Sequence, residues 1–205
     1  MIRSLSFLTC ATAIILLTLG CTTPGERPSS ENESPVPKPP VAYEQKVEMY
    51  SAGEAEYAGF YNTFSYKATL LNNDVRTASL DRQASYYQWD ADKISLERAK
   101  MQQELASYTA VFISFYTPER INDNLSDEKS IWKVYLDVGG RRYQGEVKRQ
   151  RTLLAELQAL YPYHTRWNTP YQIQFSVPTN AVETQTSVVT VTGPLGTKTV
   201  SIRSL

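Results

Sequence analysis

Cysteine and histidine are scarce in this chain of 205 residues. The two cysteines, Cys10 and Cys21, both lie near the N-terminus, and the single histidine is His164. Residues 22–205 therefore have no thiol for a disulfide, a thiolate metal site or a cysteine nucleophile. A zinc site built on paired histidines is excluded, and any Ser/His/Asp triad would have to use His164.

An excess of one charge is also missing, because 21 Lys and Arg residues balance 21 Asp and Glu residues. No long block of like charge occurs, so a basic face for nucleic acid or anionic lipid is not indicated. The longest apolar segment, from Leu5 to Leu19, has about fifteen residues, fewer than the roughly twenty of a membrane-spanning helix.

The N-terminus has the layout of an export signal, with Arg3 in front of the apolar segment. The run Leu17–Cys21, with the sequence Leu-Thr-Leu-Gly-Cys, resembles the lipobox of bacterial lipoproteins. This resemblance implies a signal peptide at residues 1–20, cleavage before Cys21, and lipidation of Cys21 with acyl chains on its sulfur and amino group. Thr22 in place of Asp resembles the pattern of lipoproteins sent to the outer membrane of Gram-negative cells.

Residues 21–42 hold six of the eleven prolines and almost no apolar side chain. Such a composition cannot bury enough surface to offset its ordering entropy, so we expect a disordered linker. At about 3.1 Å per residue in a polyproline-like state, its 21 residues after the cysteine could reach roughly 65 Å. We expect a plain tether, with a spacer that holds the domain away from the bilayer as the alternative.

Alternating apolar residues predict about seven strands within residues 43–205, which should form a single β-rich globular domain. In the first of them, Phe60 and Phe64 are expected to share one buried face. The Gly139–Gly140 pair predicts a two-residue hairpin turn. The predicted strands cover residues 57–71, 109–116, 132–138, 143–147, 171–177, 187–192 and 197–203.

A helical insertion is predicted at about residues 74–107, a stretch without Gly or Pro. We expect two helices there, separated near Asp90, which has the chemistry of a helix cap. Leucines at helical spacing predict a further amphipathic helix over residues 150–161.

These elements predict a mostly β fold with inserted helices, arranged as an immunoglobulin-like β-sandwich, because seven short strands need a second sheet to cover their apolar face. The alternative is an α+β fold with one antiparallel sheet and the helices on one side. The portion from Trp132 to Gly196 is similar in style to uncharacterised envelope lipoproteins, a resemblance that implies no particular activity.

No catalytic set, metal site or cofactor site is predicted from the residues present. A lone histidine in an aromatic segment, such as His164, is typical of a hydrogen-bonded packing residue. The loop at residues 122–128 lacks the central Gly and terminal Glu of a helix-loop-helix calcium site, which favours a plain acidic turn.

Aromatic residues are plentiful, with 14 Tyr and 3 Trp. Two clusters, Tyr86–Trp89 and Tyr161–Trp167, either fill the space between helices and sheet or form a binding surface. The candidates for such a surface are Tyr87, Trp89, Tyr163, His164, Arg166 and Trp167.

The sequence therefore favours a membrane-anchored lipoprotein of the cell envelope, facing the periplasm from the outer membrane, that binds another envelope protein as an accessory module. The first alternative is a module that binds peptidoglycan or another glycan through the same aromatic residues. The second is a hydrolase of unrecognised type. No nucleic acid partner is expected.

Overall fold

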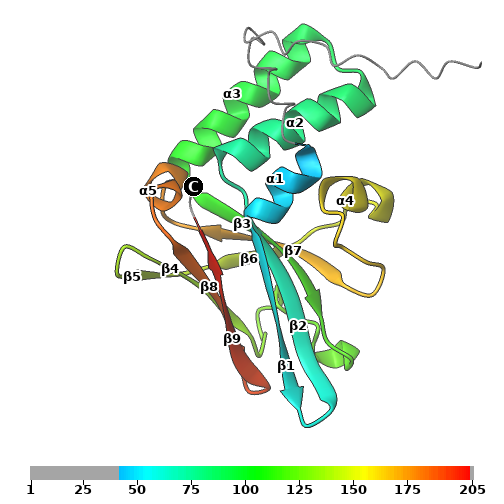
Figure 1. The fold of residues 1–205 in the computed structure, drawn as a ribbon, viewed down its shortest axis with the longest axis vertical. Coiled ribbons are helices and arrows are strands. Elements are labelled where there is room, and N and C mark those ends of the chain that lie inside the picture. Colours follow the sequence, from blue (N-terminus) through cyan, green and yellow to red (C-terminus); the bar gives the residue numbers. More distant parts are fainter. Residues whose placement is uncertain (1–41, 204–205) are drawn as a thin grey trace, which may run out of the picture. The chain divides into compact units, whose positions relative to one another are not determined.

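The computed structural model describes residues 42–203, and its elements alternate between hairpins and helices along the chain. The fold is mixed α+β with two antiparallel sheets of five and four strands (Figure 1). The helices are α1 (Tyr43–Met49), α2 (Asn73–Tyr87), α3 (Ala91–Ser107), α4 (Leu154–Leu160) and α5 (Thr179–Glu183), with a 3-10 turn η1 (Arg120–Asn122).

The larger sheet has the strand order β1-β2-β3-β7-β6, and the smaller sheet has the order β5-β4-β8-β9. The larger sheet consists of β1 (Ser51–Ala58), β2 (Tyr61–Leu70), β3 (Thr109–Tyr116), β7 (Thr169–Phe175) and β6 (Glu146–Arg149). The smaller sheet consists of β5 (Arg141–Gln144), β4 (Lys133–Val138), β8 (Ser187–Gly193) and β9 (Gly196–Ile202).

One stretch of chain, β5 followed by β6, belongs to both sheets. Its first half pairs with β4 and its second half pairs with β7, so the chain changes sheets at Gly145. Gly145 fits this crossing because a Cβ there would overlap the side chain of Ile173 and lie 2.9 Å from the Phe175 ring. The Gly145 N–H is still satisfied, since it donates to the Val134 carbonyl at 2.9 Å.

The two sheets share a hydrophobic core. Phe64 and Phe115 come from the larger sheet and contact Trp132, with ring centroids 4.8 and 5.4 Å away respectively. The Tyr66 hydroxyl donates to the Lys198 carbonyl at 2.9 Å, which links β2 to β9 across the interface. Each fully buried side chain of this size contributes about 1.5–3 kcal/mol to folding.

The second face of the larger sheet packs against helices and an aromatic segment. Along β3, Val111, Ile113 and Phe115 alternate with Phe112 and Ser114, and all five are buried. Phe112 stacks on Tyr161 with ring centroids 3.6 Å apart. Because both faces are covered, β3 has the continuous apolar character of a central strand.

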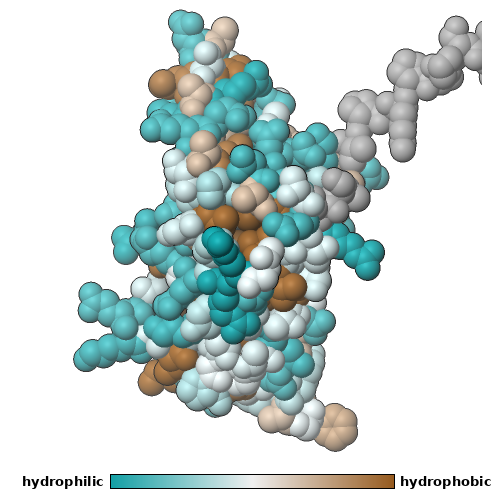
Figure 2. Space-filling model, turned by 90° about the vertical axis from the view of Figure 1, so that its left-hand side faces the viewer, coloured by the Kyte–Doolittle hydropathy of each residue, from teal (hydrophilic) through white to brown (hydrophobic). Residues whose placement is uncertain are grey.

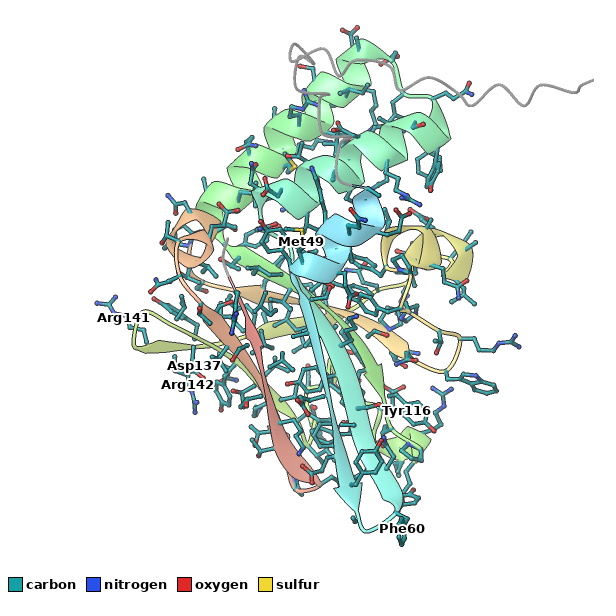
Figure 3. The ribbon with its side chains drawn as sticks, in the orientation of Figure 1. Met49, Phe60, Tyr116, Asp137, Arg141 and Arg142 are labelled. Atoms are coloured by element: carbon teal, nitrogen blue, oxygen red, sulfur yellow. The ribbon has the colours of Figure 1, made fainter. Side chains whose placement is uncertain are left out.

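The sequence identified several elements correctly. The range of β3 is confirmed, the helical insertion consists of α2 and α3, and the Asp90 side chain accepts a hydrogen bond from the Lys93 N–H as the cap of α3. Gly139 and Gly140 form the expected turn with φ of 57° and 74°. Beside that turn, Arg142 donates two hydrogen bonds to Asp137, at 2.7 and 2.9 Å (Figure 3).

Other elements differ from the prediction. The strand expected over residues 57–71 contains the end of β1, a two-residue turn and β2, and most of β1 was not predicted. Phe60, expected on the apolar face of that strand, lies fully exposed in the turn. The helix expected over residues 150–161 is shorter and begins at Leu154. The helices α1 and α5 were not predicted.

The fold class corresponds to the α+β alternative, although that alternative had one sheet and the structure has two. The mostly β interpretation underestimated the helices, and the immunoglobulin-like arrangement stays a prediction. The expected signal peptide at residues 1–20, the lipidation site Cys21 and the linker up to residue 41 lie outside the described residues.

Candidate functional site

The six candidate surface residues fall in three places. Tyr87 and Trp89 lie at the end of α2, where the two rings stack with centroids 6.1 Å apart. Tyr163 and His164 lie against the helical face of the larger sheet. Arg166 and Trp167 are exposed in the loop before β7.

His164 is only 2 % exposed and packs edge-on against Phe112. Its Nδ1 lies 2.8 Å from the Ser114 hydroxyl, and among the hydrogen bonds of residues 42–203 no carboxylate contacts the ring. Burial lowers the pKa of His164, which favours the neutral imidazole. This environment fits the packing role that the sequence indicated for a lone histidine.

Tyr163 is held between β2 and α1. Its hydroxyl hydrogen-bonds to Thr69, and the Lys67 ammonium lies 4.8 Å from the centre of its ring. Burial raises the pKa of Tyr163 well above its ordinary value. Tyr163 therefore contributes to the packing of the helical layer more than to an exposed surface.

A pocket of about 350 Å³ opens between α2, α3, α4 and the helical face of the larger sheet. Trp89 is the one candidate residue in its wall, which also includes the stacked rings of Phe112 and Tyr161. Its other lining residues are Leu71, Val75, Arg76, Ser79, Leu80, Gln83, Glu97, Met101, Gln150, Thr152, Glu156, Leu157, Leu160 and Gln172.

Several polar groups in this pocket already have partners, inside or outside its wall. Arg76 forms an ion pair with Glu104 at 2.5 Å, and the Gln150 amide donates to the Gln172 side-chain oxygen at 2.7 Å. These contacts neutralise the one guanidinium in the wall, and the Glu97 carboxylate is paired with Lys93 and Lys100. The rest of the wall is amides, hydroxyls, hydrocarbon and the Glu156 carboxylate, which suits a partly apolar group without negative charge.

Apolar side chains lie exposed close to the pocket. Leu153 is 77 % exposed, adjoins the lining residue Thr152, and is followed by the exposed Leu154. Tyr87 is exposed as well, and desolvation together with the neighbouring Glu156 carboxylate raises its pKa. These residues come from α2 and the start of α4, so the pocket has an apolar border on two sides.

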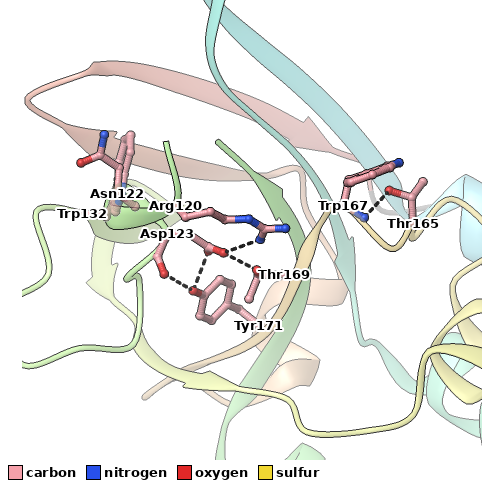
Figure 4. A network of polar contacts seen from close by, with 8 residues as sticks. All are labelled: Arg120, Asn122, Asp123, Trp132, Thr165, Trp167, Thr169 and Tyr171. Carbon is pink, nitrogen blue, oxygen red and sulfur yellow. Dashed lines mark hydrogen bonds and ion pairs between the residues drawn. The ribbon is translucent and has the colours of Figure 1, made fainter. Parts of the chain in front are cut away.

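The loop that holds Arg166 and Trp167 is ordered by its own side chains (Figure 4). The Thr165 hydroxyl hydrogen-bonds to the Asn168 side chain and accepts from the Trp167 N–H at 3.3 Å. The Arg166 guanidinium lies 5.8 Å from the centre of the Trp167 ring. This loop lies apart from the pocket, whose lining includes none of its residues.

Asp123 was missed as an organising residue because the sequence placed it in a plain acidic turn. Its carboxylate accepts hydrogen bonds from Thr169 and, at 2.9 Å, from the Tyr171 hydroxyl (Figure 4). Burial and the Asp123 charge raise the pKa of Tyr171. Asp123 therefore fixes η1 against β7, and only its tertiary contacts reveal this role.

No group of three or more metal-binding side chains occurs within the part of the chain that the structure describes. Within the same range, no helix is both long and apolar enough to cross a membrane. Comparison of the chain with known protein families, curated proteins and solved structures finds no match. Functional inference therefore depends on the pocket, its border and the N-terminal resemblance.

Proposed function

We propose that this chain is a lipid-anchored accessory protein of the bacterial cell envelope that binds a segment of another envelope protein in the helix–sheet pocket. The observation that carries the proposal is the pocket with its apolar border at Tyr87, Leu153 and Leu154. A non-enzymatic role agrees with the paired charge of Arg76 and with the burial of His164.

A protein partner suits this site because exposed apolar residues next to a pocket are typical of protein interfaces. The pocket volume lies at the lower end of the roughly 300–1,000 Å³ range of ligand sites, enough for one or two inserted side chains. Trp89 and Tyr87 belong to the residue types that dominate interface energetics. The border would add contact area around the inserted group.

The lipid anchor in this proposal is Cys21. Acyl chains contribute about 0.8 kcal/mol per buried methylene, and two or more hold a protein stably on a bilayer. We place the protein on the periplasmic face of the outer membrane, on the strength of the lipobox resemblance and Thr22. The proposal also retains an immunoglobulin-like sandwich as the finer description of the two sheets, supported by their shared core of Phe64, Phe115 and Trp132.

The test is chemical cross-linking of the tagged protein in cells, followed by affinity purification and mass spectrometry. Leu153→Glu places a charge at the pocket border without disturbing the core, because Leu153 is largely exposed. Met49→Glu is the matched control, since Met49 is an exposed apolar residue on α1 outside the pocket lining (Figure 3).

We expect one partner in near-equal amount with the wild type and with Met49→Glu, and at least a ten-fold loss with Leu153→Glu, about 1.4 kcal/mol. Equal recovery from both variants would exclude the pocket as the binding site. Release of Cys21→Ser from the membrane fraction tests the anchor separately.

A glycan ligand is the second candidate function, favoured by Gln83, Gln150 and Gln172 in the same wall as Trp89. Amide side chains hydrogen-bond sugar hydroxyls, and an indole face packs on the apolar face of a sugar ring. Co-sedimentation with purified cell-wall sacculi that is lost in Trp89→Ala would support this candidate. Absence of co-sedimentation would exclude binding to peptidoglycan and would favour a protein partner.

A further inference from the structure

Exposed aromatic side chains gather at the β1–β2 turn, the end of the domain opposite α1. The turn has two residues, Gly59 and Phe60, and Gly59 has a φ of 63° at its first position. Phe60 is fully exposed, and Tyr57 and Tyr61 on either side of the turn are also exposed. Figure 3 shows Phe60 at the tip of the hairpin, and Figure 2 shows apolar atoms at the same extremity.

Two further loops bring large apolar residues to this end. The register pairs Ser65 of β2 with Tyr116 and Phe115 of β3 with Thr169, so β3 ends and β7 starts on the side of the sheet where β2 starts. The β1–β2 hairpin continues four residues further, from Ser65 to Tyr61, and projects beyond the other two loops. After β3 comes η1 with Ile121, which is 83 % exposed, and before β7 comes Trp167, which is 62 % exposed.

Both loops are rigid supports for these side chains. Asp123 ties η1 to Thr169 and Tyr171, and the Thr165 hydroxyl holds the Trp167 backbone. These polar contacts, from η1 to β7 and within the Thr165–Asn168 loop, hold the backbone beneath the exposed apolar groups. Fixed apolar groups lose little further conformational entropy when they bind.

Each of the two loops also pairs its apolar residue with an arginine. Arg120 precedes Ile121, Arg166 precedes Trp167, and both guanidinium groups are exposed. Arg120 makes one long contact with the Asp123 carboxylate, at 3.4 Å, and its side chain is still 63 % exposed. Glu119 accepts from the Asn122 amide at 3.0 Å, and no ion pair is found for Arg166 among residues 42–203. An apolar group beside a guanidinium matches the boundary between acyl chains and phosphates in a phospholipid layer.

We propose that the β1–β2 turn, η1 and the Thr165–Asn168 loop together dock the domain on a phospholipid bilayer. Phe60, Ile121 and Trp167 enter the interfacial layer, and Arg120 and Arg166 bind lipid phosphates. This docking proposal rests on the proposed lipid anchor, which holds the protein at a membrane. Binding would be driven mainly by insertion of apolar side chains, which is consistent with the balanced charge of the chain.

The length of the tether allows this end to reach the bilayer that holds the anchor. From Tyr43 to the turn the chain runs through the seven residues of α1 and the eight of β1. These span about 10 Å and about 27 Å respectively. The linker can extend about 65 Å, so the domain can turn over and place the hairpin on the membrane.

A bilayer fits this end better than a protein surface does. The three apolar residues project from separate segments, and none of them lines any of the three described pockets. A protein partner would need matching holes and about 1,200–2,000 Å² of complementary area. Lipid headgroups rearrange around separate protrusions, so no such complementarity is required.

The test uses the mature chain, residues 21–205 with Cys21→Ser, which carries neither lipid nor the apolar segment Leu5–Leu19, in flotation with phosphatidylethanolamine–phosphatidylglycerol vesicles. We expect it to float with the vesicles, and the triple variant F60S, I121S and W167S in the same background to lose at least ten-fold in partitioning. Phe60→Trp, which keeps an aromatic ring at the tip, should float as well as its parent.

The matched control removes three exposed apolar residues from the helical layer, M49S, Y86S and L96S, and should leave flotation unchanged. Failure of Cys21→Ser to float, or equal flotation of the triple variant, would overturn the docking proposal. So would loss of a cross-linked protein partner in the triple variant without any vesicle binding.

The two proposals fail separately. Mass spectrometry of the wild type reads acylation directly, and its absence would overturn the anchor whatever the vesicles show. An acylated wild type whose Cys21→Ser form ignores vesicles would keep the anchor and exclude docking by the hairpin end.

Discussion

At the scale of single residues, close packing decides which side chains the chain tolerates. Gly145 occupies the point where two sheets meet, and Ile173 and Phe175 fill the space that a side chain would need. Gly140, in the turn between β4 and β5, has open space around it, so glycine is favoured there only because the backbone has a positive φ. The two glycines thus serve different physical purposes.

Gly145→Ala should lower the free energy of unfolding by about 2–3 kcal/mol, because the new methyl overlaps buried side chains. Gly140→Ala should cost about 1 kcal/mol, since it strains a left-handed backbone without a clash. Urea denaturation followed by circular dichroism measures both. A smaller loss for Gly145→Ala than for Gly140→Ala would contradict the crossing geometry.

His164 predicts a pH dependence of stability. Burial lowers its pKa in the folded state below the unfolded value near 6.5, so the unfolded chain binds more protons in acid. The contribution of His164 to the free energy of unfolding is fully present above about pH 6.5, and it is lost as the pH falls toward the pKa of the folded state.

Urea midpoints measured from pH 8 to pH 5 should therefore fall for the wild type as the pH drops below about 6.5. His164→Asn keeps a polar partner for Ser114 and cannot titrate, so its midpoint should fall less over the same interval. An identical decline in both proteins would assign the effect to carboxylates instead.

At the scale of elements, local chemistry explains what the sequence predicted well. The turn at Gly139–Gly140, the cap at Asp90 and the apolar run of β3 each depend on neighbours in sequence, and each is correct. The α1 helix has one buried residue, Val47, so its stability comes from docking and its pattern is weak.

The errors come from tertiary effects. The alternation of apolar and polar residues continues through Phe60 and therefore predicted one strand. In the structure, Gly59 and Phe60 form a turn, and β2 runs back along β1. In the same way, the aromatic cluster Tyr86–Trp89 identified Trp89 as a candidate. The pocket that Trp89 lines also includes Gln172 and Leu157, which come from distant segments of the chain. Periodicity contains no information about such long-range neighbours.

The Asp123 contacts give a prediction for η1. Asp123→Ala removes the carboxylate that accepts from Tyr171 and Thr169 and leaves Tyr171 only the longer contact with the backbone carbonyl of residue 123, at 3.3 Å. The loss should cost about 1–3 kcal/mol and loosen η1 from β7. Hydrogen exchange of Arg120–Asn122 should accelerate in this variant. Asp127→Ala, in the exposed part of the same loop, should change neither exchange nor stability by more than about 0.5 kcal/mol.

At the scale of the whole molecule, the apolar interior has two parts. One core spans both sheets and reaches the helices α1, α2 and α4, whereas Leu80, Met101 and Leu105 form a separate cluster between α2 and α3. The α3 helix thus packs mainly on a small cluster that is separate from the core shared by the sheets.

We therefore expect α3 to open before the sheets. Native-state hydrogen exchange should show amides of α3 exchanging through a sub-global opening, while amides of β3 exchange only at the global free energy of unfolding. Met101→Ala should lower protection of α3 by about 2–3 kcal/mol and of β3 by less. Equal losses in both elements would indicate a single cooperative unit.

The strand shared by both sheets has a mechanical consequence. In the lipid-anchored form that we propose, the tether would transmit pulling forces to the domain. Because β5 and β6 form one strand across the crossing at Gly145, a force that separates the sheets must rupture backbone hydrogen bonds to β4 or β7 as well as core contacts. The crossing segment β5–β6 therefore makes the two sheets resist separation under a pulling force.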